Sequence, residues 1–296
     1  MLTFVKEQLR SRSVFSWIAI GAATLLMLAA VVLLAVIFLV ILFGPTLNPN
    51  ADASPSTSST APVTEPTHPP LPDNPYSAGD FAYRNGYLTC LAGESLLGVD
   101  VSSHQGYIDW QQVADAGIQF AMIRIGYRGY GNGETVEDTL WEENLQGARA
   151  AGLQVGIYFF SQAITVEEAE EEAQLAISWL SGTPLDLPIV FDWEPISDTA
   201  RTANMDAETL NACALAFSEK VKAAGYEPMV YFNLDTSTRL LDLPLLQEAG
   251  YDFWLALYKD TMTYPYRIHM WQYTDGGSVA GINGNVDINL YFTYNK

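Results

Sequence analysis

Residues 188–194 read PIVFDWE, an apolar run that ends on two acidic side chains, Asp192 and Glu194. A short run with no polar residue before its end is typical of a parallel strand that is covered on both faces. Side chains two residues apart on a strand point to the same side. The two carboxyl groups are therefore expected to lie together where this strand ends.

Other apolar runs with strand character surround this one. They span residues 98–102, 120–125, 155–160, 229–232, 253–258 and 268–273. Helical patterns separate the earlier runs; Asp109 and Thr165 are expected to cap two of these helices, which end near glycines. Strands and helices alternate at first and strands then follow one another, so the pattern predicts an α/β barrel that begins as β/α units and ends mostly as strands.

The paired acids suit one kind of chemistry. Barrel enzymes place their reactive groups at the C-terminal ends of the strands. Two neighbouring carboxyl groups drive one of them toward protonation while the other stays ionised. Glycoside hydrolysis needs a neutral acid to protonate the leaving oxygen and an anion to support the anomeric carbon. The spacing of Asp192 and Glu194 alone also allows a salt-bridged pair, a metal-binding pair or loop carboxylates in solvent.

Two further acids belong to the first and last parts of the predicted barrel. Asp100 lies in GVDVSSHQGYIDW at residues 98–110, and Asp287 lies in GNVDIN at residues 284–289. Because closure of a barrel brings its first and last strands together, we expect four carboxyl groups in one cleft. His104 is expected to form hydrogen bonds or to contact the substrate rather than to bind a metal, because the chain has only three histidines and no H-E-x-x-H spacing.

Aromatic side chains accompany the acids. The rings within or at the ends of the predicted strands are Tyr158, Phe160, Trp193, Tyr231, Trp254, Tyr258, Trp271 and Tyr273. The apolar face of a sugar stacks well on such rings, but alternation along the strands places about half of them in the core. Our candidates for substrate binding are Tyr158, Tyr231 and Trp271.

The net charge and the number of cysteines exclude some classes of partner and site. Of 296 residues, 34 are acidic and 14 are Lys or Arg, which gives a formal net charge of −20. Such a surface repels phosphate backbones, so nucleic acid is a poor candidate partner. The two cysteines, Cys90 and Cys213, are too few for a disulfide scaffold or a Cys-rich zinc site. One bridge between them is allowed, although a buried free thiol is the commoner outcome.

A long apolar segment lies near the N-terminus. Residues 14–43 contain no charged side chain, and about 20 apolar residues suffice to cross a bilayer. We predict a single transmembrane helix there, with residues 1–13 in the cytoplasm because their basic side chains precede the span. A cleaved signal peptide with an A-x-A site at residues 51–53 is the alternative, although its apolar region is typically only about 7–15 residues long.

The segment after this span differs in composition from both of its neighbours. Residues 44–87 are rich in Pro, Ser and Thr and have no apolar periodicity, which predicts a disordered linker. Residues 88–296 then form the predicted barrel. With the N-terminus in the cytoplasm, this barrel is expected to be extracellular.

Six segments in order carry a family resemblance. They are GVDVSSHQGYIDW, IRIGYRGYG, AGLQVGIYFFSQA, PIVFDWE, FWLALY and WQYTDGGSVAGINGNVDIN. From about Leu97 to the C-terminus the chain resembles the lysozymes of glycoside hydrolase family 25, the Chalaropsis-type muramidases. The resemblance implies an irregular TIM-like (β/α)5(β)3 barrel. It also implies hydrolysis of the β-1,4 bond between N-acetylmuramic acid and N-acetylglucosamine in peptidoglycan.

The same resemblance implies roles for individual residues. Glu194 matches the family's proton donor, Asp192 its partner acid, and Asp100 and Asp287 two further active-site carboxylates. Asp192 either attacks the anomeric carbon or orients the substrate's 2-acetamido group as an internal nucleophile, and we favour the second route. Neither route requires a metal or an organic cofactor.

Two other classes of function stay open beside a muramidase. A non-catalytic peptidoglycan-binding membrane protein would use the same cleft for recognition, but the presence of all four acids favours an enzyme. A metal-dependent deacetylase acting on the same polymer is disfavoured by the scarcity of histidine. The predicted anchor and linker favour remodelling or turnover of the cell's own wall, because they raise the local concentration of the enzyme there.

Overall fold

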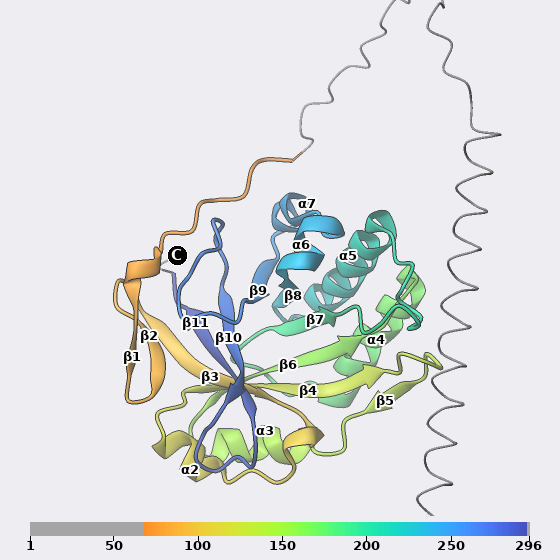
Figure 1. The fold of residues 1–296 in the computed structure, drawn as a ribbon. Helices are drawn as coiled ribbons and strands as arrows, with labels where there is room; N and C mark the ends of the chain where they lie inside the picture. Colours follow the sequence, from red (N-terminus) through yellow and green to blue (C-terminus); the bar gives the residue numbers. More distant parts are fainter. Residues whose placement is uncertain (1–67, 295–296) are drawn as a thin grey trace, which may run out of the picture. The chain divides into compact units, whose positions relative to one another are not determined.

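Parallel pairing of β3 (Ser95–Val101) with β4 (Phe120–Arg128) closes a barrel in the computed structural model, which describes residues 68–294 (Figure 1). Continuing around the barrel from β4, the other strands are β6 (Gln154–Ser161), β7 (Ile189–Trp193), β8 (Pro228–Asn233), β9 (Asp252–Ala256), β10 (Met270–Gly277) and β11 (Val286–Phe292). Only β11 runs antiparallel to its neighbours in the barrel, β10 and β3. A short strand, β5 (Thr135–Glu137), pairs with the end of β4.

Helices follow each of the first five barrel strands. They are α2 (Trp110–Asp115), α3 (Trp141–Ala150), α4 (Val166–Leu180), α5 (Ala207–Ala223), and the pair α6 (Leu234–Arg239) and α7 (Leu243–Glu248). Asp109 and Thr165 cap α2 and α4 as predicted, since their side chains accept hydrogen bonds from the backbone N–H groups of Gln112 and Glu168. The predicted α/β barrel, with β/α units first and strands last, is confirmed.

Alternation along the strands separates two apolar layers. The layer inside the barrel consists of Phe120, Met122, Tyr158, Leu187, Val190, Met229, Tyr231, Trp254, Ala256 and Met270. The second layer lies between the barrel and its outer elements and includes Phe191 and Trp271. Gly98 makes room for the inner layer, because a Cβ at this position would lie 2.3 Å from the ring of Phe120. The inner apolar layer occupies the barrel below the carboxyl ends of the strands.

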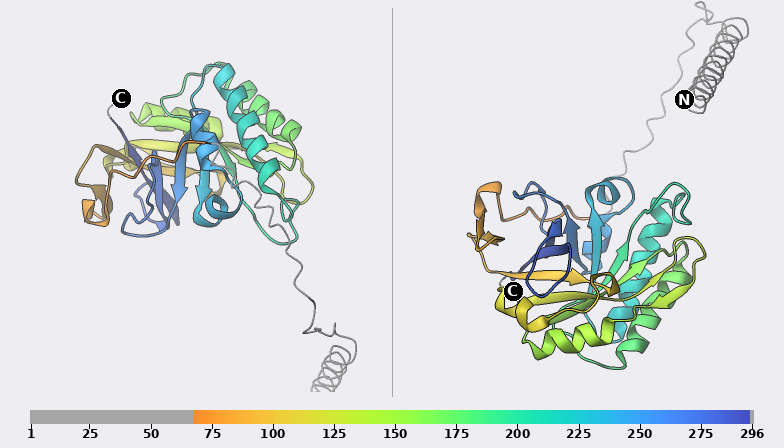
Figure 2. Two further views of the ribbon diagram at one scale, coloured as in Figure 1. Left: turned by 90° about the horizontal axis from the view of Figure 1, so that it is seen from above. Right: turned by 60° about the horizontal axis from the view of Figure 1, so that its bottom comes forward.

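A hairpin of β1 (Phe81–Arg84) and β2 (Tyr87–Cys90) covers strands that have no helix (Figure 2). Phe81 packs edge-on against Trp271 with ring centroids 5.1 Å apart. The hairpin turn is Asn85-Gly86, and both residues have positive φ, as a two-residue type I′ turn requires. The hairpin thus shields the outer face of β10.

This hairpin corrects the predicted disordered linker at residues 44–87. From residue 68 onward the chain is ordered: Asp73 bridges to Tyr266, η1 (Ala78–Asp80) follows, and β1 begins at Phe81. The linker prediction rested on the Pro-rich composition and overlooked the apolar side chain of Phe81, which packs on Trp271 of β10. The rest of the predicted linker, the predicted span at residues 14–43 and the predicted cytoplasmic segment lie outside the described residues.

The commoner outcome expected for the two cysteines, a buried free thiol, is confirmed. Cys90 and Cys213 are both buried and free. Strand β11 was not among the predicted strands, although Asp287 was expected near the first strand. In residues 68–294, none of the helices combines the length and the apolar character that a bilayer crossing needs.

Candidate active site

All four predicted acids line one pocket of about 130 Å³ at the carboxyl ends of the strands. The residues around it are Asp100, Arg124, Tyr158, Phe160, Asp192, Glu194, Tyr231, Trp254, Tyr258, Gln272 and Asp287. Each of the eight barrel strands supplies at least one of these residues or leads directly into one. The predicted convergence of distant acids therefore exists in the fold.

Asp192 and Glu194 come from the end of β7. Val190 belongs to the inner layer and Phe191 to the outer one, so the alternation that starts in the apolar run directs Asp192 inward. Asp192 is buried, and its Oδ1 atom has no hydrogen-bond partner among residues 68–294. Burial, together with the charge of Glu194, raises the pKa of Asp192 well above its usual range. Burial and the nearby Asp100 raise the pKa of Glu194 to about 7.

The backbone at Glu194 is fixed by a buried amide. Gln162 donates a hydrogen bond of 2.7 Å from Nε2 to the carbonyl oxygen of Glu194. Thr202 donates its hydroxyl to Gln162 Oε1 at 3.2 Å, and Arg201 donates to the Gln162 carbonyl oxygen at 3.0 Å. These contacts hold the start of the loop after β7, and with it the carboxyl group of Glu194.

Asp100 and Asp287 face each other across strands β3 and β11, where they are register partners. Asp100 Oδ2 accepts hydrogen bonds from Gln272 Nε2 at 2.9 Å and from Asn289 Nδ2 at 2.7 Å. Burial raises the pKa of Asp100, whereas these amide bonds act to lower it. Burial and the charge of Asp100 raise the pKa of Asp287 to about 8. One of these two carboxyl groups thus holds a proton at neutral pH.

The guanidinium group that lines the pocket is engaged elsewhere. Arg124 pairs with Asp138 at 2.9 Å, and its second contact is the hydroxyl of Ser103 at 3.4 Å. Its charge acts to lower the pKa of Asp192, but one guanidinium group cannot balance four carboxyl groups in a small space. Such an environment raises carboxyl pKa values.

Two of the four predicted substrate-binding residues line the pocket and two do not. Tyr158 and Tyr231 line the pocket, and Tyr231 donates its hydroxyl to Gln272 Oε1 at 3.0 Å. The prediction for Trp271 is wrong: its side chain is fully buried in the outer layer and donates Nε1–H to the carbonyl oxygen of Leu257 at 2.8 Å. Its neighbour Gln272 takes the inward position. His104 lies exposed on η2 (Ser103–Gln105) and does not line the pocket.

Sequence reasoning missed several residues of the pocket and its surroundings. Gln272 and Asn289 bind the carboxyl group of Asp100, and Tyr258 donates to Gln272 Oε1 at 3.1 Å. A signal existed for the two amides, because Gln272 is a polar residue inside an apolar strand and Asn289 lies two residues after Asp287 on the same face.

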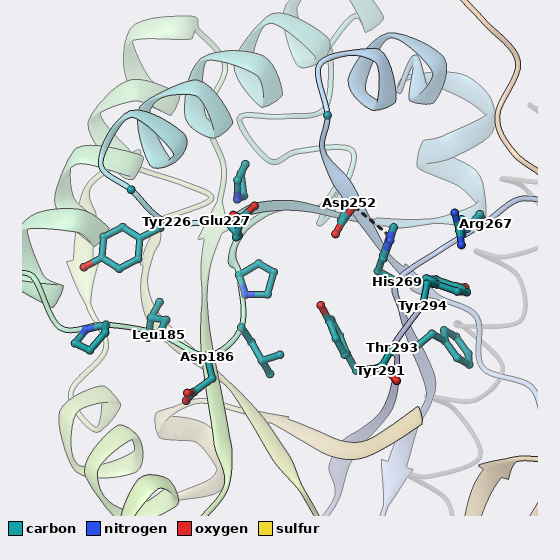
Figure 3. Close-up of a pocket in the computed structure, with 17 residues that line it drawn as sticks. Leu185, Asp186, Tyr226, Glu227, Asp252, Arg267, His269, Tyr291, Thr293 and Tyr294 are labelled. Carbon is teal, nitrogen blue, oxygen red and sulfur yellow. Dashed lines mark ion pairs between the residues drawn. The ribbon is translucent and has the colours of Figure 1, made fainter. Parts of the chain in front are cut away.

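A larger hollow of about 760 Å³ lies near the amino ends of strands β7 to β10 (Figure 3). Asp252 and His269 form an ion pair there at 3.3 Å, and the guanidinium carbon of Arg267 lies 4.0 Å from the ring centroid of Tyr294. None of the four predicted acids lines it. Because this end of an α/β barrel serves stability rather than chemistry, the smaller acidic pocket is the candidate active site. Within the described part of the chain, no three His, Cys, Asp or Glu side chains are grouped so as to hold a metal ion.

The chain is similar in sequence to known proteins. The sequence profile of the glycosyl hydrolases family 25 matches residues 99–282. "Uncharacterized protein YegX" of Escherichia coli K12 is 31% identical over 218 residues, which cover 68% of this chain and 71% of that protein. The autolytic lysozyme of Clostridium acetobutylicum is 26% identical over 204 residues, which cover 66% of this chain and 56% of that protein.

A solved structure shows the same fold. The modular autolysin LytC from Streptococcus pneumoniae matches with a TM-score of 0.59 and 23% identity, over 72% of this chain and 52% of that one. The match therefore spans only about half of the length of that autolysin.

Proposed function

Since the chain belongs to the glycosyl hydrolases of family 25, we propose that it is a muramidase, a lysozyme that cleaves the β-1,4 bond between N-acetylmuramic acid and N-acetylglucosamine in peptidoglycan. One observation carries the proposal: Asp192 lies on β7 and Glu194 directly follows that strand, both line the same pocket, and both have raised pKa values. A carboxyl group that keeps its proton near neutral pH is what cleavage of a glycosidic bond requires.

Glu194 is the proton donor in this proposal. Its pKa of about 7 leaves a large fraction of the carboxyl group protonated at neutral pH, so that it can give a proton to the glycosidic oxygen as the bond to the anomeric carbon breaks. The resulting carboxylate then takes a proton from the water that attacks in the second step. This exchange of roles restores the acid for the next turnover.

Asp192 orients the nucleophile. Its Oδ1 atom is buried and has no hydrogen-bond partner in residues 68–294, which suits an acceptor for the N–H of the substrate's 2-acetamido group. The carbonyl oxygen of that group attacks the anomeric carbon and forms a cyclic intermediate, which water then opens. Direct attack by Asp192 is the alternative route, and a covalent sugar adduct on Asp192 in a trapped intermediate would establish it.

The decisive experiment is product analysis with the full chain on purified peptidoglycan. Mass spectrometry is expected to find muramic acid at the new reducing ends. Glu194→Gln removes the proton and is expected to lower the rate by roughly 10²–10⁴-fold, whereas Glu208→Gln, an exposed change on α5, is the matched control. Reducing-end glucosamine would contradict the assignment. Binding of peptidoglycan without cleavage by the wild type would favour a recognition protein.

We also propose that residues 14–43 anchor the enzyme in the cell membrane, with the barrel outside and the cell's own wall as its substrate. The absence of charged side chains over this run supports the proposal. Fractionation of cells that express the full chain tests it. Recovery of the protein in the culture supernatant rather than the membrane fraction would contradict the anchor.

A further inference from the structure

Resting on the proposed function, we propose that Gln272, together with Asn289, is a positioning residue that keeps the shared proton of the Asp100–Asp287 pair on Asp287 and holds Asp100 as an anion beside Glu194. Both amides contact an active-site acid, Asp100. Neither amide is assigned a role in transferring a proton or attacking the sugar.

The first step is that the acid pair holds a proton. Asp100 and Asp287 are direct register partners on adjacent strands, and Gln272 Nε2 lies 2.9 Å from Oδ2 of Asp100 and 3.5 Å from Oδ2 of Asp287. Two carboxyl groups held this close repel each other when both are ionised, so one of them binds a proton. The remaining question is which of the two acids carries it.

Both amides have a fixed orientation. Gln272 Oε1 accepts the hydroxyl protons of Tyr231 at 3.0 Å and Tyr258 at 3.1 Å. Asn289 Oδ1 accepts the indole N–H of Trp254 at 2.9 Å, and an indole nitrogen can only donate. Each amide oxygen is thus occupied, and each amide nitrogen must face the acids.

The amide nitrogens favour one acid over the other. Asp100 Oδ2 receives N–H donors from Gln272 at 2.9 Å and from Asn289 at 2.7 Å, whereas Asp287 Oδ2 receives only a long contact of 3.5 Å from Gln272. Hydrogen bonds from N–H groups stabilise the charged form of a carboxyl group. Asp100 is therefore the anion, and Asp287 carries the proton.

The ionised state of Asp100 also affects Glu194, the proposed proton donor. The negative charge of Asp100 raises the pKa of Glu194, so an ionised Asp100 helps Glu194 to keep its proton. The titratable or charged groups that act on Asp100 and its partner are Arg124, Tyr158, Asp192, Glu194, Tyr231, Tyr258, Asp275 and Asp287. Among them, Arg124 supplies the positive charge, and Asp138 already pairs with it.

The test compares the pH profiles of the full chain and the variant Gln272→Met, which keeps the length of the side chain but removes the amide. Loss of an N–H donor raises the pH at which Asp100 ionises. The proton then shifts toward Asp100 and the negative charge beside Glu194 falls, so the alkaline limb of kcat/KM should move downward by about one pH unit, while kcat near pH 5 stays within about twofold of the wild type. KM should change less than about threefold. Gln174→Met, an exposed change on α4, is the matched control.

Several outcomes separate the possibilities. A loss of kcat that is equal at all pH values would assign Gln272 a merely structural role and overturn the inference. Carbon NMR of the aspartate carboxyl groups in the wild type gives a test that does not depend on the folding of a variant. It should show Asp287 protonated and Asp100 ionised at pH 6, and the reverse would overturn the inference. Absence of muramic acid ends from the wild type would instead defeat the proposed function, whatever the NMR titration shows.

Discussion

Asp287 lies opposite Asp100 where the last strand of the barrel pairs with the first, and both carboxyl groups contact Gln272 Nε2, at 3.5 Å and 2.9 Å. These residues are far apart in the sequence and become neighbours only because β11 enters the barrel antiparallel between β10 and β3. The pairing of β11 with β3 therefore creates the charge repulsion between these two acids. It also links the stability of the fold to the protonation of the site.

The first prediction concerns stability against pH. The pKa of Asp287 is raised from 3.8 to about 8 by burial and by Asp100, so the folded state binds this proton more tightly than the unfolded chain does. The resulting stabilisation is complete below about pH 4 and is lost as the pH rises toward 8. Asp192 and Glu194 contribute with the same sign.

Asp287→Asn should flatten this dependence, because an amide stays neutral at every pH and can still donate to Asp100. Urea unfolding between pH 5 and pH 8 measures the change. Asp235→Asn, an exposed change on α6, should leave the slope as it is in the wild type. An unchanged slope in Asp287→Asn would show that Asp287 does not hold the proton.

The second prediction concerns the rate against pH. Glu194 must be protonated to act, and its pKa is about 7. The value of kcat/KM should therefore decline about tenfold per pH unit at pH values well above 7. An aryl glycoside substrate with a good leaving group needs little protonation, so its alkaline decline should be much weaker. The same steep decline with both kinds of substrate would remove Glu194 from the role of proton donor.

The third prediction separates the outer layer of the barrel from its pocket. Trp271→Phe removes part of a fully buried side chain and its hydrogen bond to Leu257, and should lower the free energy of unfolding by about 1–3 kcal/mol with KM unchanged. Tyr258 lines the pocket with half of its surface exposed, so Tyr258→Leu should raise KM several-fold with little loss of stability. Denaturant unfolding and steady-state kinetics on the same samples measure both effects. A rise in KM for Trp271→Phe would contradict the assignment of Trp271 to the outer layer and would indicate that its side chain contacts the substrate.

The contrast between Trp271 and Asp192 shows how far the sequence can predict the site. The run before Asp192 is apolar and unbroken, so alternation fixed the common direction of Asp192 and Glu194. Near Trp271 both faces of the strand carry large side chains, because the hairpin at residues 81–90 covers the outer face. Because the sequence did not reveal that the hairpin covers β10, the side chain of Trp271 could not be assigned to the inner or the outer face.

The amides of the site were harder to predict than its acids. Gln272 and Asn289 bind an aspartate that lies 172 and 189 residues earlier in the chain. Four carboxyl groups share a chemistry that a reader of the sequence can anticipate, whereas a single amide acquires its role only from neighbours that the fold supplies. The order of strands and helices was predictable because each element carries its own local pattern and caps.

The last prediction concerns Gln162, which is fully buried and donates to the carbonyl oxygen of Glu194 at 2.7 Å. Gln162→Leu keeps most of the volume but leaves that carbonyl and the hydroxyl of Thr202 without their partner. The backbone at Glu194 should then move, and kcat should fall about tenfold or more, because small displacements of a catalytic group cost rate. Thr202→Val is the matched control, since it removes one contact to Gln162 and keeps the bond to Glu194; it should lower stability by about 1 kcal/mol and leave kcat within about twofold of the wild type. Equal losses of kcat in both variants would show that general loosening of the loop, and not the hydrogen bond to Glu194, controls the rate.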